Sequence, residues 1–410
     1  MIKTICTIGQ INTKDATMPY RIFYVNGPGN TIRHWSEDQN DPRAVTFLSQ
    51  FKELCWEVGA KAYTIAYHSD KAICCDGQFK LEHRPKPMPG SGGIRYHLAQ
   101  ALYALSLFCT AVRFRADVAV LESGTSQYFM LSIFKLAGIK LVVILHNTLW
   151  PTGFPPTARV ARFIATLDSL FFGWLPSGII GVSPECIRQV KQLTKGKHRP
   201  IYQMRAQFRR EYFQAIPRLW PSNRQPFRIL YMGRIIRYKG VFDILDMAKR
   251  IEAQRSGRVH WEIHGDGPDS EELARLQAEM RLRHVVSIYG WTSAQDAQEV
   301  YARTHVSIVP TRSNFCEGLA MAAVESVLAG RPVITSAVTP ALEVLRPACV
   351  EARTDDVDSY VRAILRLVDR PDEYGALCKA CSLVQEQFYD PEKGFKVALK
   401  NVIFPACSSG

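Results

Sequence analysis

The feature that most constrains the fold of this chain is a regular alternation of short apolar runs with longer stretches of helical spacing. In the first half the runs are RIFYVNG (21–27), AYTIAYH (62–68), VAVLESG (118–124), KLVVILHN (140–147) and GIIGVS (178–183). In the second half they are FRILYMGR (227–234), HWEIHGDG (260–267), VVSIYGW (285–291), VSIVPT (306–311) and PVITSAV (332–338). Helical spacing fills 45–58, 95–113, 160–175, 241–252 and 318–328. Such alternation is typical of strands in parallel sheets covered by helices. We therefore predict an α/β protein with two Rossmann-like, doubly wound sheets.

A proline-rich segment separates the two blocks. At 410 residues the chain is too long for one ordinary core. The segment IPRLWPSNRQP (216–226) contains three prolines and has no apolar period, which indicates a linker. We expect an N-terminal domain over 1–218 and a C-terminal domain over 219–384, facing each other across a cleft. A helix over 376–403 should cross back, so that about 385–410 belongs with the first domain.

Composition and charge narrow the class of protein. Hydrophobic residues make up 47% and charged residues 22% of the chain, which excludes a disordered or fibrous protein. No apolar run reaches the roughly 18 residues of a membrane span, and the N-terminus lacks signal-peptide features, so we expect a cytoplasmic protein. The eleven cysteines do not cluster with histidines as a zinc site requires. The net charge of +13 falls almost entirely in residues 1–215, which favours an anionic partner of that half.

Ligands of open parallel sheets bind beyond the carboxyl ends of the strands, which directs attention to three loops. The loop GRIIRYKG (233–240) carries Arg234 and Lys239, which could converge on one anion, and Gly233, which lets backbone approach a ligand. The loop HGDGPDSEEL (264–273) ends its strand tightly at Gly265 and Gly267. Taken alone, either loop is also compatible with ordinary surface chemistry.

The third loop, NFCEGLAMAAVE (314–325), places two carboxylates, Glu317 and Glu325, eight residues apart. We expect a helix to begin at about Gly318, so that the amides of Gly318, Leu319 and Ala320 are free to bind a diphosphate. Eight helical residues rise about 12 Å and leave both carboxylates on one broad side. The two are too far apart to share a proton and should contact different parts of one elongated ligand.

These motifs resemble those of retaining GT-B glycosyltransferases, and the second half resembles glycosyltransferase family 4. The features are GR…KG, GDGP, VPTRS and EGLAMAAVESVLAGRPVI, in the family's order over about 120 residues. The resemblance implies a nucleotide-sugar donor whose departing diphosphate is neutralised by Arg234 and Lys239. It implies that Glu317 holds the transferred sugar and Glu325 the ribose, with amides after Glu317 on the phosphates. It also implies that the nucleobase lies near residues 290–292, which include Gly290 and Trp291.

In the first half the resemblance is weaker. Gly27, Gly29 and Asn30 are similar to the family's glycine-rich loop, where donor phosphate and acceptor meet, and 91–93 (SGG) could be a second such loop. His146 matches a histidine near the donor sugar or the acceptor nucleophile. After GVSPECIRQV the chain departs from the family pattern with IYQMRAQFRREYF, which contains Arg205, Arg209 and Arg210.

The segment PTARVARFIATLDSLFFGWLP (156–176) has the composition of a basic amphipathic interfacial helix, although a core helix fits the pattern as well. With the positive charge of this half, it supports peripheral contact with an anionic membrane and a lipid-linked acceptor. We find no nucleic-acid recognition motif.

The sequence as a whole predicts a retaining, metal-independent hexosyltransferase that moves a sugar from a UDP or GDP donor to a hydroxyl acceptor in polysaccharide or glycolipid synthesis. No cofactor and no metal are expected, because no D-x-D triplet suited to holding a metal and a diphosphate appears in the chain. Two alternatives remain open at this point. One is a GT-B-like sugar-nucleotide epimerase, and the other is a non-catalytic sugar-nucleotide binding protein.

Overall fold

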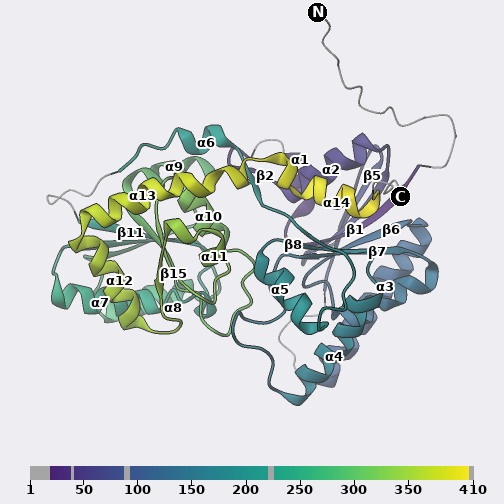
Figure 1. The fold of residues 1–410 in the computed structure, drawn as a ribbon, viewed down its shortest axis with the longest axis horizontal. Helices are drawn as coiled ribbons and strands as arrows, with labels where there is room; N and C mark the ends of the chain where they lie inside the picture. The colour runs from purple at the N-terminus through teal and green to yellow at the C-terminus, as the bar shows by residue number, and fades with distance from the viewer. Residues whose placement is uncertain (1–18, 38–40, 87–92, 220–225, 406–410) are drawn as a thin grey trace, which may run out of the picture.

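Two parallel sheets, each covered by helices, form the two lobes of the molecule (Figure 1). The computed structural model describes residues 19–37, 41–86, 93–219 and 226–405. The first sheet lies entirely before the predicted linker and the second entirely after it. The predicted α/β class with two Rossmann-like sheets is thus confirmed, whereas the boundary at 218/219 stays a prediction.

The first sheet has eight strands in the order β4-β5-β3-β1-β6-β7-β8-β9. Their bounds are β1 Arg21–Pro28, β3 Lys61–Tyr67, β4 Ala72–Asp76, β5 Phe79–Arg84, β6 Val118–Glu122, β7 Lys140–Leu145, β8 Gly178–Gly181 and β9 Ile201–Gln203. All neighbours pair in parallel except β4 and β5, which form an antiparallel hairpin at one edge. All five residues of β6 are buried, as the apolar run predicts. The sequence analysis missed the hairpin and β9.

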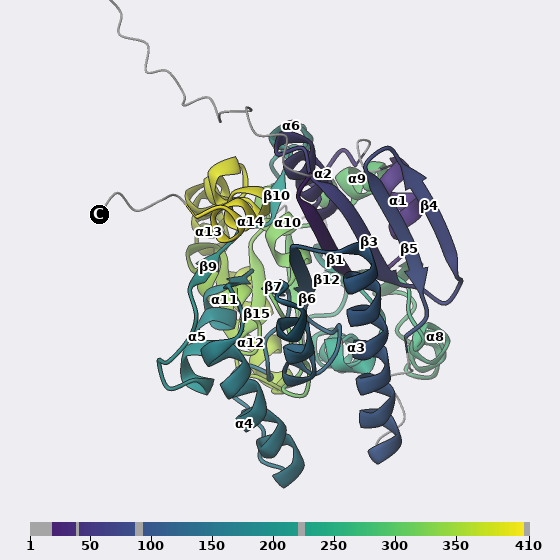
Figure 2. The same cartoon turned by 90° about the vertical axis from the view of Figure 1, so that its right-hand side faces the viewer.

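Helices cover both faces of this sheet: α1 Thr31–Glu37, α2 Phe47–Glu57, α3 Ile94–Phe114, α4 Arg159–Trp174 and α5 Pro184–Leu193, with the 3-10 helix η2 Tyr128–Ala137. Two of them are fixed by side-chain caps. The Thr46 hydroxyl accepts from the Ser49 amide at the start of α2, and the Ser183 hydroxyl accepts from the Cys186 amide at the start of α5. Helices α3 and α4 extend together beyond the same end of the lobe (Figure 2).

The second sheet has six parallel strands in the order β13-β12-β11-β14-β15-β16. Their bounds are β11 Phe227–Met232, β12 Val259–His264, β13 Val286–Gly290, β14 Val306–Val309, β15 Val333–Ser336 and β16 Cys349–Ala352. The accompanying helices are α7 Asp243–Gln254, α8 Ser270–Glu279, α9 Ala294–Arg303, α10 Met321–Leu328, α11 Ala341–Val344 and α12 Val357–Asp369. All five predicted strands are present, and β16 was missed.

Glu262, in the middle of β12, is fully buried and paired. Its carboxylate lies 2.9 Å from Arg228 Nη1, 2.8 Å from Arg303 Nη2 and 3.4 Å from His264 Nε2. Although burial alone would raise the pKa of Glu262, hydrogen bonds from His264 and the two arginines lower it to about 2. This cluster ties β11, β12 and α9 together below the candidate site.

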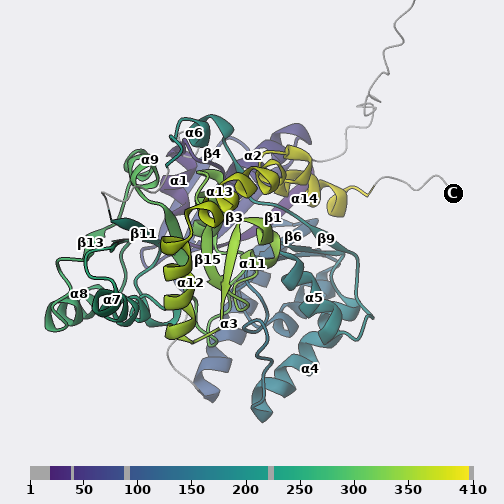
Figure 3. The ribbon, with the colours of Figure 1, turned by 60° about the vertical axis from the view of Figure 1, so that its left-hand side comes forward.

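Two segments cross between the lobes. The first passes through β10 Gln207–Phe208, which pairs antiparallel with β2 Ala44–Val45 of the first lobe, and through α6 Arg210–Gln214. The chain returns through α13 Pro371–Gln385 and α14 Phe395–Ile403 (Figures 1 and 3). α14 packs against α2 and β8, and Lys396 Nζ lies 2.6 Å from Glu53 Oε1.

The return segment differs from the single helix predicted over 376–403. Two short 3-10 turns, η5 Glu386–Phe388 and η6 Pro391–Lys393, separate α13 from α14. Pro391 has no backbone N–H, and Gly394 is extended with φ −75° and ψ 172°, so the α-helical hydrogen-bond pattern cannot continue through this stretch.

Candidate functional site

The loop after β11 and the loop after β14 meet through a pair of opposite charges. Lys239 Nζ lies 2.5 Å from Glu317 Oε2 and 4.7 Å from the centre of the Phe315 ring. The Thr311 hydroxyl donates to the same carboxylate oxygen over 3.3 Å, and the Glu317 residue is buried. The carboxylate is thus held at the carboxyl ends of neighbouring parallel strands, where ligands of such sheets bind.

Arg234, the second predicted cation of this loop, is placed differently. Its backbone carbonyl accepts from the Tyr231 hydroxyl over 2.7 Å, whereas its side chain is exposed and forms no ion pair with any residue that the structure describes. The convergence of Arg234 and Lys239 on one anion stays a prediction, and in this structure Lys239 pairs with Glu317.

Three of the predicted glycines lie at the carboxyl ends of adjacent strands, where backbone hydrogen bonds connect one strand end to the next. The Gly233 amide donates to the His264 carbonyl over 2.9 Å, and the Gly265 amide donates to the Gly290 carbonyl over 2.7 Å. A Cβ on Gly265 would lie 1.8 Å from the Gly233 carbonyl oxygen, so only glycine permits this approach. Trp291, the next residue after Gly290, is 76% exposed. The structure therefore brings Gly233, Gly265 and Gly290 together and leaves the indole of Trp291 open to contact.

The helix after Glu317 begins later than predicted. α10 starts at Met321, and Ala320 has a left-handed φ of 63°, so Gly318, Leu319 and Ala320 precede the helix and do not form its first turn. The prediction of a helix from Gly318 was wrong for a tertiary reason. Gly318 packs against the other lobe, where an added Cβ would lie 1.6 Å from the His146 carbonyl oxygen. The backbone bends at Gly318 and Leu319 and passes through the left-handed Ala320 before α10 begins.

Glu325, within α10, faces the first lobe. Its Oε2 lies 3.6 Å from Arg43 Nη1 and accepts from the Tyr301 hydroxyl over 3.4 Å. Burial raises the pKa of the Glu325 carboxyl, while the Arg43 charge opposes that rise. Glu317 and Glu325 share no hydrogen-bond or ion-pair partner among the described residues. Arg43 was missed by the sequence analysis, because a partner nearly 300 positions away in sequence leaves no local signal.

His146 lies at the end of β7, beside a buried carboxylate from β6. His146 Nε2 is 3.2 Å from Glu122 Oε1, and the ring stacks obliquely on Phe47 with centroids 4.7 Å apart. The Gly27 amide donates to Glu122 Oε2 over 2.6 Å, and the Tyr24 hydroxyl donates to Glu122 Oε1. Burial and the neighbouring Glu122 raise the pKa of Tyr24 well above its usual value, which keeps this donor protonated.

Glu122 therefore positions both the glycine-rich loop and His146, and the sequence analysis did not single it out. The available signal was a lone carboxylate at the end of the otherwise apolar run VAVLE, because buried acidic residues are rare unless they are paired.

The other predicted residues of the glycine-rich loop, Gly29 and Asn30, hydrogen-bond to backbone groups beside the loop. The Gly29 amide donates to the Tyr67 carbonyl, and Asn30 Oδ1 accepts from the Arg33 amide at the start of α1. Gly93 immediately precedes α3, while Ser91 and Gly92 lie outside the described residues.

Two of the three arginines of the departing segment, Arg205 and Arg210, hydrogen-bond to the return crossing. Arg205 Nε donates to Gln387 Oε1 over 2.7 Å, Arg209 Nε donates to the Asp41 carbonyl over 2.9 Å, and Arg210 binds both carboxylate oxygens of Glu386. They tie the first crossing to its surroundings and do not approach Glu317 or His146.

Within the described part of the chain no group of three or more His, Cys, Asp or Glu side chains is arranged to hold a metal ion. The acidic triplet at 356–358 begins α12, where Asp356 caps the helix and Asp358 pairs with Arg250. Nor does any helix among the described residues combine the length and apolar character that crossing a membrane requires.

Gly318 joins the two halves of the site. On one side it follows Glu317 and the bound Lys239, and on the other it packs on the His146 backbone, next to Glu122 and Gly27. The site therefore offers a cation, two buried carboxylates and a histidine, contributed by both lobes. Such a set suits an elongated anionic ligand with several hydroxyl groups, because carboxylates accept from hydroxyls and cations bind phosphates.

Comparison with known families and sequences agrees with this arrangement. Residues 213–381 match the family model described as "Glycosyl transferases group 1". A curated relative, an uncharacterized glycosyltransferase of Methanocaldococcus jannaschii, is 28% identical over 119 residues. That match covers 29% of this chain and 29% of the relative's length, so it extends over less than a third of either protein.

Solved structures resemble nearly the whole chain. Sucrose-phosphate synthase from Thermosynechococcus elongatus has a TM-score of 0.67 at 14% identity, covering 93% of this chain and 97% of that one. Trehalose 6-phosphate synthase from Burkholderia multivorans has a TM-score of 0.72 at 10% identity, with 94% and 97% covered. HepE from Anabaena, solved in complex with UDP, has a TM-score of 0.62 at 14% identity, with 94% and 98% covered. At these identities the likeness establishes the GT-B fold.

Proposed function

We propose that this chain is a retaining glycosyltransferase that moves a hexose from a nucleoside-diphosphate sugar to a hydroxyl acceptor without a metal ion. The observation that carries the proposal is the position of the Lys239–Glu317 pair, which Gly318 brings against the His146–Glu122 pair of the other lobe. The glycosyl transferases group 1 match over the second lobe supports it. UDP is favoured over GDP because HepE was solved with UDP and with UDP and glucose.

In the proposed mechanism the donor diphosphate lies against Lys239 and Arg234. Lys239 exchanges its contact with Glu317 for one with the diphosphate, and the released carboxylate accepts hydroxyls of the sugar. As the bond from the anomeric carbon to the diphosphate oxygen breaks, the acceptor oxygen bonds to the same face of that carbon. The acceptor proton passes to the departing diphosphate, whose developing charge the two cations stabilise. Glu122 holds His146 beside the reacting sugar as a positioning residue.

Glu325 is proposed to hold the donor ribose. We expect Glu325→Ala to weaken UDP binding by about 10- to 150-fold, because losing a hydrogen bond to a charged group costs about 1.5–3 kcal/mol. Isothermal titration with UDP, GDP and ADP measures the effect and the base preference. Glu299→Ala on α9, an exposed carboxylate, is the matched control. Arg43→Met should not weaken UDP binding, and an unchanged affinity in Glu325→Ala removes the ribose assignment.

We further propose that α3 and α4 contact an anionic membrane that presents a lipid-linked acceptor. Both helices carry exposed apolar side chains at helical spacing: Ile94, Leu98, Leu102 and Leu105 on α3, and Val160, Phe163, Leu170 and Trp174 on α4. Phe171 and Phe172 of α4 are buried, so α4 packs one face on the lobe and leaves a second apolar face open. Arg95, Arg159 and Arg162 supply positive charge on these helices. Figure 2 places both helices at one end of the lobe.

Cosedimentation with vesicles of phosphatidylserine and phosphatidylcholine tests this surface. Wild-type protein should bind at low salt and less at high salt, because surface charges are screened. Replacing both Phe163 and Trp174 with Ser should weaken vesicle binding at least 10-fold, because burying each of these apolar side chains in the membrane contributes about 1.5–3 kcal/mol to the binding free energy. Leu383→Ser, which changes an exposed leucine of α13, should bind as wild type. Absence of wild-type binding at low salt contradicts the proposal.

A further inference from the structure

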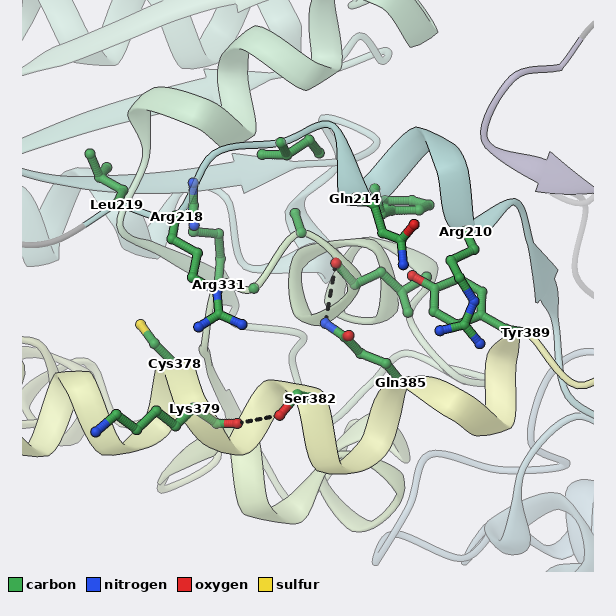
Figure 4. Close-up of a pocket in the computed structure, with 15 residues that line it drawn as sticks. Arg210, Gln214, Arg218, Leu219, Arg331, Cys378, Lys379, Ser382, Gln385 and Tyr389 are labelled. Atoms are coloured by element: carbon green, nitrogen blue, oxygen red, sulfur yellow. Dashed lines mark hydrogen bonds between the residues drawn. The ribbon is translucent and has the colours of Figure 1, made fainter.

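A cavity of about 260 Å³ lies where both crossings between the lobes pass each other, away from the Lys239–Glu317 pair (Figure 4). One wall is the first crossing, from α6 to Leu219. The opposite wall is α13, and the floor is the turn that ends α10 at Arg331. We call this space the crossing pocket. It is unrelated to the loops after β11 and β14, and nothing in the proposed reaction uses it.

The charge that lines the crossing pocket is of one sign. Arg210, Arg218, Arg331 and Lys379 line it, and none of the described lining residues is acidic. Arg210 is neutralised by its two hydrogen bonds to Glu386. The side chains of Arg218 and Lys379 are exposed and have no ion-pair partner among the described residues. Arg218 and Arg331 therefore line this small space without a carboxylate among the described lining residues, while the Lys379 side chain runs along α13 at the rim (Figure 4).

Arg331 is the unusual member of this group. Its side chain is only 1% exposed, yet its two hydrogen bonds go to neutral carbonyls: Nε donates to Tyr301 over 2.9 Å, and Nη2 donates to Pro217 over 2.6 Å. Burial lowers the pKa of Arg331, and the groups that oppose this lowering are Tyr374, Cys378 and Cys381, none of which is a carboxylate. In Figure 4 its guanidinium lies between the first crossing and α13. A buried guanidinium without a counter-ion is costly unless an anion accompanies it.

Neutral groups beside these cations suit a polar ligand. The Ser382 hydroxyl and the Gln385 amide line the pocket from α13, and Gln385 Nε2 donates to the Val327 carbonyl over 2.7 Å, which holds the amide at the wall. The volume lies just below the range of roughly 300–1,000 Å³ for sites of drug-sized ligands. This favours a small occupant. Planar guanidinium groups bind the oxygens of phosphates and carboxylates in pairs. Several cations at one site favour the phosphoryl group, because its charge exceeds that of a single carboxylate.

We propose that the crossing pocket binds a phosphoryl anion, either free phosphate or the phosphate of a small sugar phosphate, through Arg331 and Arg218, with Lys379 adding positive charge at the rim. The site lies between the first crossing and α13, so an occupant would link the two segments that connect the lobes. It is independent of the donor site.

Thermal unfolding in inorganic phosphate tests the proposal on the full chain. Phosphate should raise the midpoint by about 2 °C or more in wild-type protein, because a ligand of the folded state stabilises it. The same rise should occur in Lys239→Met, where the donor site is impaired. It should fall by at least half in the double variant Arg218→Ala and Lys379→Ala, whose exposed side chains are not needed for folding.

Glucose 6-phosphate, titrated in parallel, separates the two sources of the anion. Binding at least 10-fold tighter than that of phosphate assigns a sugar phosphate, and equal binding assigns free phosphate. Three results overturn the proposal: no rise in wild-type protein, an undiminished rise in the double variant, or loss of the rise in Lys239→Met. The last result would place phosphate in the donor site.

Discussion

Replacing Lys239 with methionine is expected to lower kcat by about 10²–10³-fold, the usual effect of removing one group that stabilises charge developing in a transition state. Methionine keeps an unbranched apolar side chain of similar length against Phe315 but removes the ammonium. In the structure that ammonium is 2.5 Å from Glu317, so it is already held at the proposed junction of sugar and diphosphate. Steady-state transfer from a UDP-sugar measures the loss.

Two controls separate chemistry from folding. Lys249→Met on α7 removes an exposed lysine from the same lobe and should leave kcat unchanged. Removing Lys239 also leaves the Glu317 carboxylate buried without its cation, so the thermal midpoint of Lys239→Met must be measured. A folded Lys239→Met protein with nearly normal kcat contradicts the leaving-group role.

Replacing Gly318 with valine is expected to lower kcat/KM by at least about 10²-fold, because misplacement of reacting groups by about 1 Å has effects of that size. Any Cβ at this position would lie 1.6 Å from the His146 carbonyl oxygen and 2.6 Å from its carbon. Both contacts are with backbone, so no side-chain rotation relieves them. The two lobes must move apart or the loop must shift.

Small-angle X-ray scattering shows which change occurs. A larger radius of gyration in Gly318→Val, with circular dichroism unchanged, indicates that the lobes have separated. Met321→Ala, three residues along and partly exposed, should keep both the activity and the radius of wild-type protein. Normal activity together with an unchanged radius in Gly318→Val would refute the idea that this contact assembles the site.

The strands of both sheets could be predicted from sequence because they are buried on both faces. β6 and β7 read as continuous apolar runs for that reason, and their ends were located to within a few residues. The β4–β5 hairpin escaped prediction because β4 is an edge strand with mostly exposed residues and no apolar alternation. Edge strands carry little of the burial signal on which such predictions depend.

The site residues of the second lobe could be identified from the sequence because they occur in motifs. The contacts between them could not be predicted in this way. Lys239 and Glu317 were both identified, but their direct pairing was not expected. The late start of α10 depends on contact of Gly318 with the other lobe, which no local pattern records. Arg43 and Glu122 act through partners that are not their neighbours in sequence, Glu325 for Arg43 and His146 for Glu122.

Proton NMR of the reaction measures both the transfer of the sugar and the retention of its anomeric configuration. Wild-type protein incubated with an α-linked UDP-hexose and a hydroxyl acceptor should release UDP and form a product whose anomeric signal has the α configuration. A β product would contradict retention. Conversion of the UDP-hexose to an epimer without acceptor, or binding with no turnover across a panel of acceptors, would contradict the proposed transfer itself.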